Sequence, residues 1–132
     1  AYRGGKLNNT MVLSETCEFY GRSGHLNTSL ADGLLSGGAV AVEGYINNVY
    51  SVYSRSMLWA TVNRLIEGET LQDAVNYSME IYGDDDIVWY DNQMTGRRSH
   101  AVASYAILDG SADARLTGSG AGSGSTSLAD AV

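Results

Sequence analysis

Short apolar runs alternate with longer stretches in which apolar residues recur every third or fourth position. Met11–Leu13 and Ala39–Glu43 are short, mostly apolar runs without polar alternation, a pattern typical of buried strands. Between them, three leucines spaced four positions apart predict a helix over His25–Gly37. The Gly37-Gly38 pair supplies its end, because glycine adopts the left-handed conformation that closes helices.

The centre of the chain predicts two further helices. Apolar positions favour a helix over about Val49–Glu67, with Gly68 behind it. Thr70 then has the character of an N-cap, with Asp73 three residues later in an arrangement similar to a capping box. The apolar stripe that follows predicts a third helix ending at Gly83.

Two more strands are expected near the end of the chain, over Ile87–Tyr90 and His100–Leu108. Strands that alternate with helices are typical of an α/β fold in which helices flank a mostly parallel sheet. From Thr117 onward the chain is almost wholly Gly, Ser, Thr and Ala. We therefore expect one domain over residues 1–116 and a flexible tail or linker over residues 117–132.

Composition narrows the functional classes. The 132 residues are 44% hydrophobic and carry a net charge of −7, which disfavours nucleic acid and anionic membranes as partners. No apolar run approaches the roughly 20 residues that span a bilayer. The single cysteine excludes an internal disulfide and a cysteine-based zinc site. Since the chain begins at Ala1, we expect a processed piece of a longer protein, with a secreted or cell-surface location favoured.

The single cysteine, Cys17, follows the run Met11–Thr16 and precedes a loop that contains Gly21 and Gly24. The carboxyl ends of strands are where open α/β sheets place their chemistry. A thiol there is held on rigid backbone and faces solvent, which favours a nucleophile. The alternative is a buried cysteine that packs as a small hydrophobic residue.

The order of the pieces resembles the C-terminal half of caspase-fold cysteine peptidases, in particular the clostripain, gingipain and CHAT-domain branches. The resemblance covers roughly residues 10–116. The segment MVLSETCEF resembles the family's strand that leads into the catalytic cysteine, and LADGLLSGGAVAVEGY is similar to its helix, turn and next parallel strand. The segment LIEGETLQDAVNYS resembles a recurrent helix start of the family, and SYAILDGSADARL resembles its closing strand.

This resemblance implies a caspase-like three-layer sandwich, of which the chain would be the C-terminal portion. It also implies a cysteine endopeptidase in which Cys17 is the nucleophile and a histidine is the general base and acid. The family's histidine precedes the cysteine, and no such segment lies before Cys17. We therefore expect a companion chain or segment to supply it, since His25 and His100 lie outside the motif. The alternative is a non-catalytic structural or assembly module with the same fold.

Two acidic residues are candidates for substrate binding. Glu15 lies two residues before Cys17, and in relatives an acid there binds a basic P1 side chain of the peptide or protein substrate. Glu43 ends the next predicted parallel strand, so it would lie at the same edge of the sheet. Two such carboxylates predict an S1 pocket for arginine or lysine. The alternatives are an outward residue of an edge strand for Glu15 and an ion pair with Arg55 for Glu43.

We expect no cofactor, although the run Asp84-Asp85-Asp86 raises the alternative of a calcium site. It lacks the interleaved spacing of an EF-hand loop, so a solvated connection is the favoured interpretation. Arg97-Arg98 is a candidate for autoprocessing by an arginine-directed enzyme, or simply surface charge.

Overall fold

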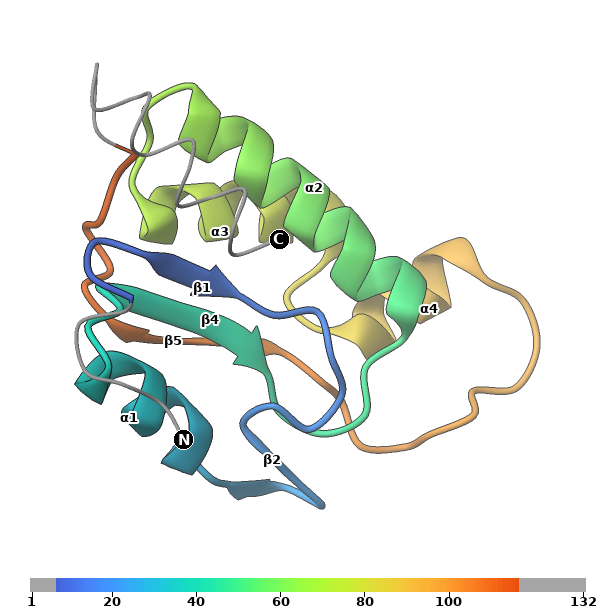
Figure 1. Ribbon diagram of the computed structural model, residues 1–132. Helices are drawn as coiled ribbons and strands as arrows, with labels where there is room; N and C mark the ends of the chain where they lie inside the picture. Colours follow the sequence, from blue (N-terminus) through green and yellow to red (C-terminus); the bar gives the residue numbers. More distant parts are fainter. Residues whose placement is uncertain (1–6, 117–132) are drawn as a thin grey trace.

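A three-stranded sheet with helices on both faces organises residues 7–116, the part of the chain that the computed structural model describes (Figure 1). The α/β fold class is thereby confirmed. The elements are β1 (Met11–Leu13), β2 (Gly21–Arg22), β3 (His25–Leu26), α1 (Ser29–Ser36), β4 (Ala41–Tyr45), α2 (Ser51–Ile66), α3 (Leu71–Tyr82), α4 (Asp86–Gln93) and β5 (Ala106–Gly110).

The sheet is mixed, with strand order β1-β4-β5. β1 runs parallel to β4, with Leu13 opposite Glu43, whereas β5 runs antiparallel to β4, with Ala106 opposite Tyr45. The prediction of a mostly parallel sheet is therefore wrong for the closing strand. β2 and β3 form a separate antiparallel hairpin.

Successive side chains of β4 point to opposite faces of the sheet and contribute to the core on both sides. Ala41 packs with β1 and with Leu65 and Val75 of α2 and α3, which cover one face. Val42 packs with Ala31 of α1 on the opposite face. Figure 1 shows α1 on one side of the sheet and α2 and α3 on the other. Because both faces are covered, all five β4 residues are buried, as its apolar run predicted.

The segment 25–37 is only partly the helix that the leucine spacing predicted. His25 and Leu26 form β3, and α1 begins at Ser29. The hairpin forms because Gly21 has a φ of +114° and lies so close to the His25 carbonyl that no side chain fits there. Leu26 and Leu30, placed on the inward stripe by the spacing, are more than half exposed.

The segment 87–90 is helical, so the predicted strand there is wrong. Its short apolar run lies within α4, and Asp85 caps that helix by accepting hydrogen bonds from the N–H groups of Ile87 and Val88, both at 2.9 Å. An aspartate N-cap sets a helix start, and this signal outweighs a four-residue apolar run. The last strand begins at Ala106, six residues later than predicted.

The other two helices are confirmed. α2 lies within its predicted range, and the Thr70 side chain accepts a hydrogen bond from the Asp73 N–H at the start of α3. Gly83 ends α3 with a φ of +104°. Within residues 7–116, no helix combines the length and apolar character needed to cross a membrane. The tail predicted over residues 117–132 lies outside the described residues.

The Asp86 carboxyl group is fully buried where three segments meet. Its Oδ2 accepts a hydrogen bond from the Tyr50 N–H at 3.0 Å, at the start of α2. Its Oδ1 accepts one from the Ser104 N–H at 2.8 Å. Oδ2 also lies 2.8 Å from Nε2 of His100. One side chain thus joins the starts of α2 and α4 to the connection that leads into β5.

We expect Asp86→Ala to lower the free energy of unfolding by about 3 kcal/mol or more, because it leaves buried N–H donors and an imidazole without their acceptor. Asp84→Ala is the matched control: Asp84 is exposed, so its loss should change stability by less than about 0.5 kcal/mol. Urea denaturation of both variants measures the difference. Equal effects of the two substitutions would contradict the role assigned to Asp86.

Candidate functional site

Cys17 lies in a turn beyond the end of β1 and is exposed. Its sulfur accepts a hydrogen bond from the Val49 N–H at 3.4 Å and donates one to the Val49 carbonyl at 3.6 Å. Val49 directly precedes Tyr50, the N-cap of α2. The thiol therefore lies at the end of the sheet where β1 and β4 finish, held by backbone at the approach to α2.

Within residues 7–116, no hydrogen bond joins the Cys17 sulfur to an imidazole. His25 is exposed on β3. His100 instead lies against Asp86, and its ring stacks on Tyr50 with 4.1 Å between centroids. The described residues therefore contain the candidate nucleophile without a base bonded to it.

The cluster of Asp86, His100 and Tyr50 is a feature that the sequence did not predict. Ser99 completes it: its N–H donates to the Tyr50 hydroxyl at 2.9 Å, and its Oγ lies 3.5 Å from Nδ1 of His100. The cluster and the thiol are anchored on consecutive backbone amides, those of Val49 and Tyr50. An acidic run and a later histidine were visible in the sequence, but nothing in their spacing indicated that they would meet.

Glu43 lies in the middle of β4, not at its end as predicted, because the strand continues to Tyr45. Its side chain is buried, and within residues 7–116 it has neither a hydrogen-bond nor an ion-pair partner. The predicted alternative, an ion pair with Arg55, is not formed. Burial raises the pKa of Glu43 to about 8, so the carboxyl group is mostly protonated at neutral pH.

Glu15 lies two residues beyond β1 and is half-buried. The pKa of Tyr45 is raised above its ordinary value, first by burial and then by the negative charges of Glu43, Tyr53 and Glu15. Both predicted pocket acids therefore act on one tyrosine. Glu43 alternates with Ala41 and Tyr45, which face α2 and α3, and no hydrogen bond or ion pair joins it to Glu15 within residues 7–116.

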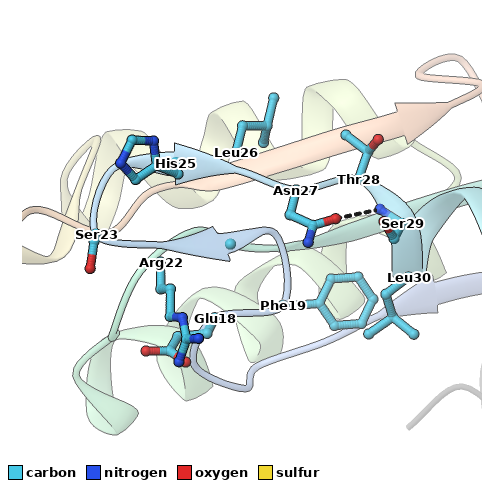
Figure 2. Close-up of a pocket in the computed structure, with 11 residues that line it drawn as sticks. Glu18, Phe19, Arg22, Ser23, His25, Leu26, Asn27, Thr28, Ser29 and Leu30 are labelled. Carbon is cyan, nitrogen blue, oxygen red and sulfur yellow. Dashed lines mark hydrogen bonds between the residues drawn. The ribbon is translucent and has the colours of Figure 1, made fainter.

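Surface depressions within residues 7–116 include one beside the β2–β3 hairpin and one beside the connection 96–101. The larger, about 860 Å³, runs between the β2–β3 hairpin and the start of α1 (Figure 2). Glu18, the residue after Cys17, lines it. The smaller, about 510 Å³, is lined by Asp91 and the connection 96–101. Cys17, Glu15 and Glu43 line neither of them.

The acidic run at 84–86 is largely occupied by protein donors. Asp85 caps α4, and Asp86 accepts hydrogen bonds from Tyr50 and Ser104. Asp84 is exposed. Within the described part of the chain, no group of three or more His, Cys, Asp or Glu side chains is arranged to hold a metal ion.

The raised pKa of Glu43 predicts a pH-dependent stability. The folded state holds the proton more tightly than the unfolded chain, in which the pKa is near 4.5. The free energy of unfolding should therefore fall as pH rises from about 4.5 to about 8. We expect Glu43→Gln to remove this decline, and to be more stable than the original chain at pH 7 by on the order of 3 kcal/mol.

Urea denaturation at pH 4, 6 and 8 measures this effect. At pH 4 the two proteins should be nearly equal, because the Glu43 carboxyl group is protonated in both the folded and unfolded states. Glu67→Gln, at an exposed position, is the control and should leave the pH profile unchanged. Parallel profiles for Glu43→Gln and the original chain would show that Glu43 is not the titrating group.

No protein-family model, curated protein or solved structure matches this chain. The groups that indicate a function are therefore the exposed thiol of Cys17, the carboxyl groups of Glu15 and Glu43, and the groove beside Glu18.

Proposed function

We propose that this chain is the C-terminal portion of a caspase-like cysteine endopeptidase that cleaves after arginine or lysine. Cys17 would be the nucleophile, and Glu15 and Glu43 would form the S1 pocket. The observation that carries the proposal is the Glu43 side chain, which is 5% exposed and has no hydrogen-bond or ion-pair partner within residues 7–116. It lies on the strand next to the one that leads to the thiol. A buried acid without a partner is costly, and a guanidinium from a substrate would compensate that cost.

The protonation of Glu43 gives this pocket a distinct property. With a pKa of about 8, the empty pocket holds a proton at neutral pH. An arginine side chain entering beside it would favour the ionised carboxylate, so binding would release the proton to solvent. Arginine recognition would then weaken as the pH falls, because the proton and the guanidinium compete for Glu43.

In the proposed reaction the Cys17 sulfur attacks the scissile carbonyl carbon and forms a tetrahedral intermediate. Within residues 7–116 the Cys17 N–H donates to no acceptor, so it is free to stabilise the oxyanion. Collapse of the intermediate expels the amine, which takes a proton from the general acid, and leaves a thioester. Water then hydrolyses the thioester and restores the thiol.

The general base would come from a companion segment. β1 is an edge strand within the described residues, yet the side chains of Met11 and Leu13 are buried. An edge strand with a free row of backbone groups is suited to pair with a further strand. A strand added there would end beside Cys17, which is where a histidine must lie to take the thiol proton.

A non-catalytic assembly module is the second candidate. Two observations favour it: among the described residues the Cys17 sulfur bonds only to the backbone of Val49, and α2 exposes apolar side chains at intervals of seven residues. These are Val52, Trp59 and Ile66, each more than half exposed. Such a stripe along one helix face is suited to packing against another subunit.

We expect Cys17→Ala to abolish cleavage of an arginine-containing peptide, with a loss of at least about a thousandfold, because no other group in the site forms the thioester. The assay uses the full chain together with the companion segment that, under this proposal, supplies the histidine. Treating the original chain with iodoacetamide should give the same loss. Since Cys17 is exposed and its sulfur bonds only weakly to the Val49 backbone, the unfolding free energy of Cys17→Ala should fall by no more than about 1 kcal/mol. Full activity in the variant would refute the proposal and favour the assembly module.

The S1 assignment predicts a selective effect of Glu43→Gln. Loss of the carboxylate should lower kcat/KM for an arginine substrate by about tenfold to a hundredfold, as expected for a charge-assisted hydrogen bond. Cleavage of a substrate with an uncharged P1 residue should change little. Glu67→Gln again serves as the control. An equal loss on both substrates would indicate a structural role for Glu43.

A further inference from the structure

Glu18, directly after Cys17, has a left-handed backbone with a φ of +60°. Such a conformation is unfavourable for a residue with a Cβ, and it persists only where the surroundings impose it. Here the Glu18 N–H donates to the Asn47 carbonyl at 2.9 Å. The sharp turn carries the chain away from the thiol and into the β2–β3 hairpin, with Glu18 lining the groove (Figure 2).

Buried Asn47 fixes the hairpin to the end of β4. Its side chain accepts a hydrogen bond from the Gly24 N–H at 2.8 Å and donates one to the Ala103 carbonyl at 3.0 Å. Its own N–H donates to the Gly21 carbonyl at 2.8 Å. The wall of the groove is therefore anchored to the sheet at both the turn and the start of the hairpin.

Apolar side chains line the groove although they are open to solvent. Leu26 and Leu30 are 58% and 54% exposed. Phe19 lies near Leu30, whereas the Leu26 side chain points away from them (Figure 2). The Phe19 ring packs over Gly44 so closely that a Cβ there would meet ring carbons at 2.6 Å and 2.8 Å. Figure 2 shows Phe19 and Leu30 near one another, with Glu18 and Arg22 together toward the other end. The surface has the chemistry to cover an apolar side chain of a ligand.

The backbone of Leu26 adds a feature that suits a polypeptide. Pairs in an antiparallel hairpin alternate between hydrogen-bonded and non-bonded. The Asn27 N–H donates to the Tyr20 carbonyl at 2.8 Å, so the adjacent pair of Gly21 and Leu26 is non-bonded. Within the described residues, the Leu26 N–H and carbonyl thus remain available to an extended chain that adds itself to this edge.

We infer that this groove binds the polypeptide substrate of Cys17 as an extended segment, with one leucine-sized apolar side chain against Phe19 and Leu30 and a neighbouring one against Leu26 (Figure 2). The occupant is argued from continuity with the thiol through Glu18 and from the free edge at Leu26. The inference rests on the proposed function for the identity of that occupant. The groove would then be a second determinant of specificity, separate from the acidic pocket, that binds apolar residues of the substrate.

Binding is measured on the full chain carrying Cys17→Ala, by fluorescence anisotropy with a short labelled peptide in which an arginine is followed by two leucines. Leu26→Asp and Leu30→Asp should each weaken binding by about tenfold or more, the effect expected for one buried leucine. Ile66→Asp, at a comparably exposed apolar position at the far end of α2, should leave binding unchanged. Replacing both peptide leucines by serine should weaken binding to the original groove similarly.

The outcomes separate this inference from the proposed function. Leucine-dependent binding that also slows alkylation of Cys17 in the original chain would support it, even if no peptide is cleaved. Cleavage that is insensitive to Leu26→Asp and Leu30→Asp would overturn it and leave the peptidase proposal standing. Equal effects of Leu26→Asp and Ile66→Asp would overturn it too. A dimer that Leu26→Asp converts to monomer would show that a second copy occupies the groove, and would also overturn it.

Discussion

The arrangement around the candidate site depends on one buried carboxyl group, that of Asp86. Burying a carboxyl group is costly unless protein donors replace the water that it loses, and the Tyr50 and Ser104 amides do so here. The side chain therefore fixes where α2 begins. The residue before that start is Val49, whose backbone holds the Cys17 sulfur. The position of the thiol is thus set by an acidic residue that lies far from it in the sequence.

β4 imposes the second constraint, since both of its faces are covered. Alternation along the strand sends Ala41, Glu43 and Tyr45 to the side of α2 and α3. Ala41 and Tyr45 pack with apolar neighbours, while Glu43 is an acid without a partner among the described residues. An apolar residue at that position would stabilise the fold, so the carboxyl group is a departure from what packing alone favours. Departures of this kind tend to occur at functional sites.

The elements that could be predicted were those with a local signal. Thr70 and Gly83 bound α3 because capping is determined within a few residues, and β1 and β4 are short apolar runs buried on both faces. The errors came where tertiary contacts decide. The leucines of 25–37 have helical spacing, but Gly21 and Asn27 close a hairpin that takes Leu26 out of the helix and exposes it. The antiparallel direction of β5 could not be predicted from the sequence either, because it depends on the path of the chain between Asp86 and β5.

The site was likewise predictable only where its signal is local. Cys17 could be selected because a lone thiol after a strand is a local pattern, whereas the contacts of Asp86 with Tyr50, His100 and Ser104 join residues distant in sequence.

The attachment of the thiol and of Asp86 to the start of α2 also has a dynamic consequence. Val49 and Tyr50 donate consecutive amides, one to the thiol and one to Asp86. An opening of this first segment of α2 would break both bonds at once. The two amide protons should then exchange with solvent in a single cooperative event, so local unfolding at Asp86 and mobility of the thiol are one motion.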